Sequence, residues 1–141
     1  MVRKLVALLS TLALAACGNA PDPHGPSLRH DASLNAPVEF LLTSAINDFR
    51  AHRPPYPARF RDARIGYVAA PDGTRQYMLC GAFLPVREAG EPEWTPFATI
   101  QTSGYEQWLG AQAAGFCGSP SIVWVEGDFS SSLQSRLDSR R

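Results

Sequence analysis

The sequence predicts a small α+β domain with an antiparallel sheet, packed helices and one disulfide, in the order α-β-β-β-α-β-α. Three observations predict this class. The spacing of apolar residues changes along the chain from helical to strand-like and back. Turn chemistry separates two neighbouring strand-like segments. All Phe, Tyr and Trp residues lie from Phe40 onward, which places one core within residues 38–141.

The first element is a helix over residues 38–52. Its apolar residues recur at intervals of three and four, which is the spacing of one helix face. They are Val38, Leu41, Leu42, Ala45, Ile46 and Phe49. The sequence Arg53-Pro54-Pro55-Tyr56-Pro57 then ends the helix, because proline lacks the backbone donor and restricts the residue before it.

Two strands over residues 61–70 and 74–85 come next. Pro71-Asp72-Gly73 between them is typical of a tight turn, so we expect a hairpin. The second strand is apolar on both faces, which indicates a central position in the sheet. A polar loop over 87–93 leads to a third strand over 94–102.

A second helix is expected after residue 102. Ser103 and Glu106 fit a capping box, in which two side chains satisfy free backbone N–H groups at a helix start. The apolar side of this helix would be formed by Trp108, Leu109, Ala113 and Phe116. Residues 118–120 end the helix, residues 122–125 are expected to form a short buried strand, and Asp128 is expected to cap a last helix.

Residues 1–16 have the pattern of a cleaved export signal. Arg3 and Lys4 precede an apolar run that is shorter than the roughly 20 residues of a membrane-spanning helix. The closing residues Leu14-Ala15-Ala16-Cys17 resemble the lipobox of bacterial lipoproteins. The resemblance implies cleavage before Cys17, diacylation of its side chain and acylation of the new amine. The alternative is an ordinary secretory signal.

Gly18, rather than Asp, follows Cys17. Under the sorting rule of enterobacterial lipoproteins, this implies anchoring in the outer membrane, facing the periplasm. Residues 17–37 are rich in proline and lack aromatic residues, which predicts a flexible linker between the lipid anchor and the domain. His24 and His30 do not predict a metal site there, because ordering each ligand in a flexible chain costs entropy. No cofactor is expected.

The charge balance argues against nucleic-acid binding. The 13 Lys and Arg residues equal the 13 Asp and Glu residues, and cleavage before Cys17 leaves 11 − 13 = −2. One segment departs from this balance. From Arg50 to Arg64 the chain has five arginines and one acid, a charge of +4 over 15 residues.

This basic segment is the candidate partner-binding surface, because arginine and aromatic residues are enriched at protein interfaces. The candidate residues are Arg50, Arg53, Tyr56, Arg59, Phe60, Arg61 and Arg64. An envelope protein is the expected partner, and anionic lipid headgroups or an acidic polymer are the alternatives. In the alternative interpretation the segment is a solvated rim whose arginines pair with acids, namely Glu88, Glu91, Glu93 and Glu126.

With Cys17 assigned to the lipid, Cys80 and Cys117 remain as an even pair in an oxidising compartment. We expect them to form a structural disulfide, which would stabilise the fold by about 4 kcal/mol. A nucleophilic Cys80 and a redox pair are the alternatives, and the chain has no C-x-x-C motif to favour either.

No catalytic motif is present in the sequence, and no catalytic residue is assigned. There is no G-x-S-x-G, no H-E-x-x-H and no phosphate-binding glycine loop. His52 is the one histidine of the predicted domain, and Asp48 lies four residues before it on the same helix face, where it could orient the imidazole. The nucleophile of such a site is not specified.

Residues 56–64, with Leu79-Cys80-Gly81 and Trp94-Thr95-Pro96-Phe97, resemble a pattern of small exported proteobacterial proteins. That pattern has a D-P-x-S-A-x-F-R-x-V segment, a C-G-x-x-N strand and a G-x-x-P-F strand. In this chain Tyr56 replaces the opening aspartate, and the asparagine after Cys-Gly is absent. The group has no established activity, so the resemblance implies a fold and transfers no site.

Together these features favour a non-enzymatic, lipid-anchored envelope lipoprotein that binds or supports another envelope protein. A periplasmic inhibitor of a cell-wall hydrolase is the alternative. Lysozyme-inhibitor lipoproteins are similar in size, anchoring and disulfide content, although they are β-barrels. A small hydrolase using His52 is a third hypothesis.

Overall fold

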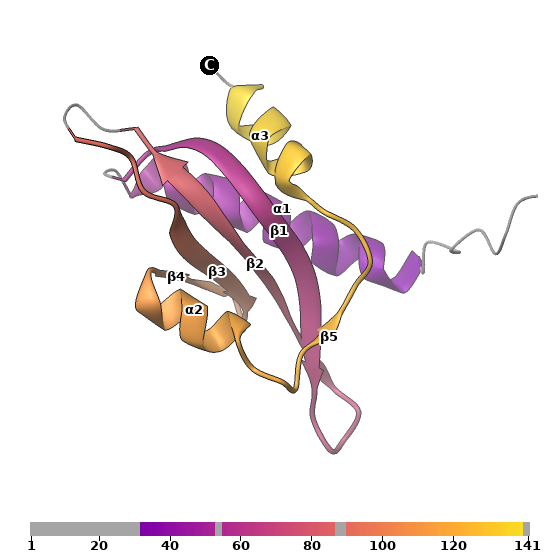
Figure 1. Ribbon diagram of the computed structural model, residues 1–141. Helices are drawn as coiled ribbons and strands as arrows, with labels where there is room; N and C mark the ends of the chain where they lie inside the picture. Colours follow the sequence, from indigo (N-terminus) through magenta and orange to yellow (C-terminus); the bar gives the residue numbers. More distant parts are fainter. Residues whose placement is uncertain (1–31, 53–54, 87–89, 140–141) are drawn as a thin grey trace, which may run out of the picture.

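The computed structural model describes residues 32–52, 55–86 and 90–139. Three helices and five strands make up this part of the chain, which is an α+β domain as predicted (Figure 1). In chain order the elements are α1 (Ala32–Ala51), β1 (Pro57–Ala69), β2 (Arg75–Pro85), β3 (Thr95–Gln101), β4 (Tyr105–Leu109), α2 (Ala111–Cys117), β5 (Val123–Trp124) and α3 (Ser130–Asp138).

The strands form one antiparallel sheet in the order β4-β3-β2-β1-β5. The predicted hairpin joins β1 to β2, and β2 is central as its apolar faces indicated. Local hydrogen bonds close its turn: Gly73 donates its N–H to the carbonyl of Ala70, Ala70 donates its own to the carbonyl of Thr74, and Asp72 accepts from the N–H and hydroxyl of Thr74. Gly73 has a φ of 84°, which favours glycine.

The sheet has helices on both sides, and we name its two faces after them. On the α1 face, α1 lies across the strands and α3 packs beside it against β1 (Figure 1). The larger core lies here, around a cluster of four phenylalanine rings whose centroids are 4.9 to 6.4 Å apart, formed by Phe49, Phe60, Phe83 and Phe97. This cluster joins α1 to three strands.

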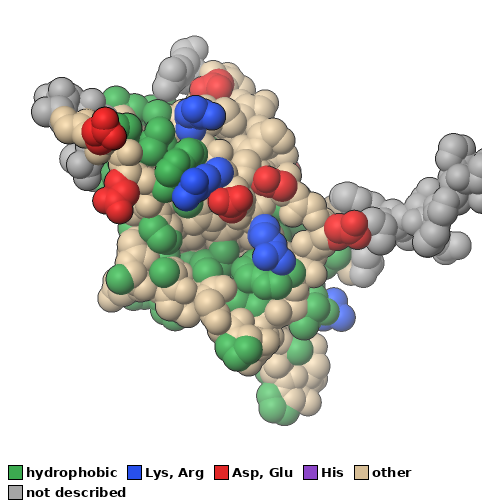
Figure 2. All heavy atoms as spheres, in the orientation of Figure 1, with side chains coloured by type: hydrophobic (Ala, Val, Ile, Leu, Met, Phe, Trp, Pro, Cys, Tyr) green, Lys and Arg blue, Asp and Glu red, His purple; other side chains and the backbone are tan. Residues whose placement is uncertain are grey.

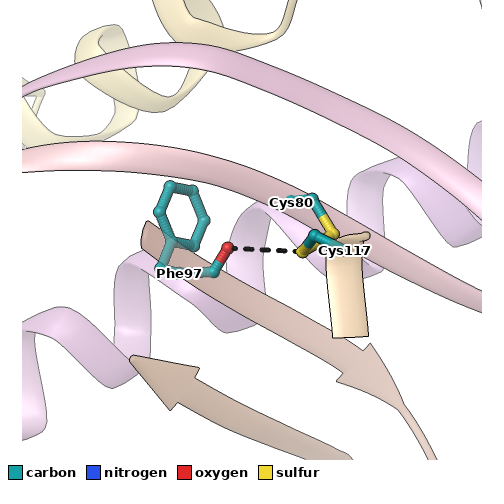
Figure 3. The surroundings of a disulfide bond; sticks show 3 residues. All are labelled: Cys80, Phe97 and Cys117. Carbon is teal, nitrogen blue, oxygen red and sulfur yellow. Dashed lines mark hydrogen bonds between the residues drawn. A yellow bond between two sulfur atoms is a disulfide. The ribbon is translucent and has the colours of Figure 1, made fainter. Parts of the chain in front are cut away.

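The α2 face carries a smaller core. Its buried members are Met78, Cys80, Ala98, Ile100, Ala113 and Ile122. The predicted disulfide is present and joins Cys80 of β2 to Cys117 at the end of α2, with their Cα atoms 5.9 Å apart. The Sγ of Cys117 lies 3.9 Å from the carbonyl oxygen of Phe97 (Figure 3), and this is a packing contact because a disulfide sulfur carries no proton.

The prediction of a helix starting at Ser103 is wrong for its first half. Residues 105–109 are strand β4, which pairs with β3, and the helix begins only at Ala111. Gly110 is the N-cap residue, with a φ of 65° and no capping side chain, so Ser103 and Glu106 do not form a capping box. In a strand, Tyr105, Gln107 and Leu109 lie on one face of the sheet. Pairing with β3 satisfies the backbone hydrogen-bonding groups of residues 105–109.

Other boundaries also differ from the expected ones. Helix α1 begins at Ala32, so residues 32–37 are helical rather than linker, and the helix continues through Pro37. One proline removes a single intrahelical hydrogen bond, which a helix with a large buried face tolerates. The last strand is Val123–Trp124, shorter than the expected 122–125, and Val123 is half exposed rather than buried. This strand lies at the edge of the sheet, where it pairs with β1 over two residues.

Asp128 acts one position earlier than an N-cap residue. The N-cap of α3 is Phe129, and the carboxylate of Asp128 accepts the N–H of Ser130 at 2.8 Å. The Ser130 hydroxyl also donates to this carboxylate and has the largest effect in lowering the pKa of Asp128. The hydrogen bond from the Ser130 N–H lowers it further. The side chain therefore still satisfies a backbone donor at the start of the helix.

Candidate interaction surface

A bulge in β1 brings three arginines to the same face of the sheet. Successive side chains of a strand point to opposite faces, so Arg61 and Arg64 would be separated in a regular strand. The pairing of β1 with β2 shifts register between them, at Asp62, whose φ is 54°. Ala63 is consequently buried on the α1 face, and Arg64 joins Arg61 and Arg59 on the α2 face. We call Arg59, Arg61 and Arg64 the arginine row.

Two members of the row stack on tryptophan rings. The guanidinium carbon of Arg61 lies 4.3 Å from the ring centroid of Trp94, which precedes β3. The guanidinium carbon of Arg64 lies 4.4 Å from that of Trp124 in β5. Such a cation–π contact is worth about 0.5–1 kcal/mol at an exposed site. It also orients the planar group, with the N–H edge left for another ligand.

The charges of the row are largely uncompensated within the described residues. Arg61 contacts the carboxylate of Asp62 at 3.4 Å, and both side chains are more than half exposed. Within 32–52, 55–86 and 90–139, Arg59 and Arg64 have no carboxylate within ion-pair distance. Glu91, Glu93 and Glu126, which were expected to neutralise the basic segment, therefore form no ion pair with the row, and Glu88 and Arg53 lie outside the described residues.

Apolar residues from neighbouring strands lie between the arginines. Leu84 pairs with Arg59 across the β1–β2 ladder, Ala82 pairs with Arg61, and Pro96 of β3 lies beyond Ala82. These residues are only partly buried, because α2 does not extend over this half of the face. Figure 2 shows the same face, with basic side chains among hydrophobic ones and acidic side chains around them.

Two of the seven predicted contact residues have roles within the fold itself. Phe60 is only 8% exposed and belongs to the phenylalanine cluster of the core. The guanidinium of Arg50 donates to the carbonyls of Arg136 and Leu137, at 2.6 and 3.1 Å, and so caps the end of α3.

Two further candidates do not join the row. Tyr56 is partly buried and packs against the core of the α1 face. Arg53 lies outside the described residues. Conversely, sequence reasoning missed Trp94 and Trp124, because each lies in a different segment and no local signal relates it to an arginine of β1.

His52 and Asp48 do interact as expected, at the end of α1. The Nδ1 atom of His52 lies 3.1 Å from the Asp48 carboxylate, and Tyr105 of β4 donates its hydroxyl to the same oxygen at 3.3 Å. Burial raises the pKa of Tyr105, and the Asp48 carboxylate raises it further. The His52 side chain is 74% exposed, and no hydroxyl or thiol of a described residue is bonded to it. This group therefore lacks a nucleophile within the part of the chain that the structure describes.

No three His, Cys, Asp or Glu side chains of the described residues are grouped in a way that would hold a metal ion. Among the described helices, none combines the length and hydrophobicity needed to cross a bilayer. Cys17, the cysteine of the predicted lipobox, lies outside the described residues.

No family model, no curated protein and no solved structure matches this chain.

Proposed function

We propose that the protein is a non-enzymatic, lipid-anchored lipoprotein of the outer membrane that binds another envelope protein in the periplasm. The contact surface is the uncovered half of the α2 face. The observation that carries the proposal is the arginine row, with two of its members stacked on Trp94 and Trp124. Arginine and tryptophan are the residue types most enriched among binding hot spots.

The composition of this half-face supports a binding role. A sheet face that simply meets water carries polar side chains, with an alternating pattern along each strand. Here Ala82, Leu84 and Pro96 form a partly exposed apolar floor between charged groups. An apolar centre with a charged surround is the usual anatomy of a protein interface.

The sequence supplies the location. Cys17 would attach the chain to lipid, and residues 17–31 lie between that cysteine and the start of α1. Fully extended, these residues reach at most about 50 Å. A domain on such a tether would meet partners close to the membrane surface.

The anchor and the surface are tested separately. Incorporation of an alkyne-labelled fatty acid tests the anchor, and Cys17→Ala is expected to abolish it. For the surface, in-cell crosslinking compares the wild type with the double variant Arg59→Glu and Arg61→Glu. The expected result is loss of the captured envelope protein from the double variant.

Arg75→Glu is the charge-reversal control for the surface, because Arg75 contacts Tyr67 at the far end of the hairpin. This control should keep the partner. Unchanged partners in the double variant would show that the assignment is wrong.

Neither alternative function gains an observation of its own. The open five-stranded sheet with helices on both faces differs from the β-barrel of lysozyme-inhibitor lipoproteins. Inhibition of lysozyme by the purified protein at micromolar concentration would nevertheless favour that alternative. For the hydrolase, a substrate panel on wild type and His52→Ala decides, since activity that depends on His52 would contradict the proposal.

A further inference from the structure

The partner's chemistry follows from the arginine row, if the proposed function holds. We infer that the row binds an extended acidic segment of the partner protein, with carboxylates on alternate residues. The inference concerns which ligand the surface takes, whereas the proposed function concerns only that it takes one.

The first step is the presentation of the guanidinium groups. Stacking holds Arg61 on Trp94 and Arg64 on Trp124, so these side chains have already lost much of their rotational freedom. A planar guanidinium accepts a carboxylate through two parallel N–H···O hydrogen bonds. Preorganised donors lose less conformational entropy on binding than mobile ones. The free energy of binding a carboxylate at these two arginines is therefore more favourable.

The second step is spacing. Side chains two apart on a strand face repeat about every 6.6–7 Å. The three arginines pair with alternate residues of β2, namely Leu84, Ala82 and Cys80, so the row covers two such repeats, about 13 Å. An extended peptide repeats its own same-face side chains at the same interval. Carboxylates on alternate residues of such a peptide can therefore meet successive arginines, while its remaining side chains avoid the surface.

The third step concerns the surroundings of the row. Helix α2 lies on the same face as the row, over β3 and β4, and its sequence AQAAGFC contains no charged residue (Figure 1). Packed elements are separated by about 8–10 Å, so a flat anionic membrane would meet this uncharged helix before the arginines. A narrow peptide has no such obstacle.

The charges around the row point the same way. Asp62, Glu91 and Glu93 are exposed, so the positive surface is a strip rather than a broad basic patch. Figure 2 shows acidic side chains near the basic ones on this face. A strip fits one acidic segment, whereas a lipid surface presents phosphates to the acids as well as to the arginines.

Two peptides of equal composition test the inference by fluorescence anisotropy on the full chain in detergent. One has eight residues of alternating Glu and Thr, and the other has four Glu followed by four Thr. We expect the alternating peptide to bind about tenfold or more tightly, because more of its carboxylates form charge-assisted hydrogen bonds with the arginines. The block peptide places fewer carboxylates opposite arginines.

Three variants distinguish the causes. Arg59→Glu with Arg61→Glu should abolish binding of the alternating peptide, and Arg75→Glu should leave it within about twofold at equal salt. Replacing all three arginines of the row by lysine keeps the charge but not the planar donors, and should weaken binding about tenfold. Circular dichroism on each variant separates loss of binding from loss of the fold.

Each remaining outcome decides against the inference. Equal binding of both peptides would show a response to charge alone. Binding of neither peptide, while the double variant still loses its crosslinked partner, would overturn the inference and leave the proposed function standing. Binding to phosphatidylglycerol vesicles but to neither peptide would assign the row to a lipid surface. If the double variant still bound the alternating peptide and still captured the partner, both the inference and the proposed function would be overturned.

Discussion

The two faces of the sheet are held in different ways. The α1 face is covered by a helix of 20 residues and by α3, and its core is a continuous set of large apolar side chains. The α2 face is covered in part by a helix of seven residues, of which only Ala113 is fully buried, and this helix is tied to β2 by a disulfide.

The difference has a physical reason. Ordering the backbone of seven residues costs about 1–2 kcal/mol per residue, and one buried alanine recovers little of it. The α1 face buries enough apolar surface to hold its helix without a covalent bond, whereas α2 depends on the strand pairing before it and on the disulfide at its last residue. The short cover also leaves half of the α2 face open for the arginine row. One face thus supplies stability, and the other leaves a surface for binding.

The largest test of this comparison is Phe97→Ala. Phe97 is fully buried among three other phenylalanines, so its removal should lower the free energy of unfolding by about 4–5 kcal/mol in urea titrations. Phe116→Ala is the matched control on the α2 face, where Phe116 is 42% exposed and packs on Trp108. It should cost no more than about 1 kcal/mol. Similar losses for both would mean that the two faces are equally packed.

The second test replaces Cys80 and Cys117 together by alanine. The bridge joins residues 37 positions apart, and its loss should cost about 4 kcal/mol in the chain-entropy treatment. Hydrogen exchange should show the amides of α2 losing protection first, while α1 keeps its own. Equal loss of protection in both helices would contradict a local role for the disulfide.

The third test separates two arginines of the basic segment. Arg50→Met removes the donor that caps the carbonyls at the end of α3, and should lower the free energy of unfolding by about 1–2 kcal/mol. Arg59→Met, on the open half of the α2 face, should change it by less than about 0.5 kcal/mol. Thermal unfolding of the two variants measures the difference. A larger loss for Arg59→Met would place Arg59 in the structural framework.

The smallest effect is a pH dependence on the α1 face. A hydrogen bond from Arg136 lowers the pKa of Glu39 below its ordinary value of 4.5, and the two side chains also attract as charges. Because the folded pKa is the lower one, the stabilisation is fully present above pH 4.5 and is lost as pH falls through the folded pKa.

The Glu39 side chain is largely exposed, so the contribution should be only about 0.5 kcal/mol. Glu39→Gln should reduce the free energy of unfolding by that amount at pH 7, and by less at about pH 3. A double-mutant cycle with Arg136→Met isolates the pair from the other carboxylates. A coupling that is unchanged by 1 M salt would contradict a screened surface interaction.

Much of the fold was predictable because the signals are local. The apolar spacing of α1, the Pro71-Asp72-Gly73 turn and the even pair of cysteines each lie within a short segment or follow from counting. Residues 105–109 were not predictable in this way. Tyr-Glu-Gln-Trp-Leu fits a helix start after Ser103 as well as a strand, and the deciding contact is β3, which the segment itself does not reveal.

For the candidate site too, local features were predictable from the sequence and long-range contacts were not. The sequence by itself determined that the chain has a basic, arginine-rich segment, one available disulfide pair and helix and strand periods suited to an α+β domain. Only the tertiary structure decided that Arg50 caps a helix, that Phe60 is core, and that a bulge at Asp62 aligns the arginine row. It also brought Trp94 and Trp124 to Arg61 and Arg64. The reason is that strand pairing joins segments distant in the chain, and which face a side chain takes depends on a register that composition does not encode.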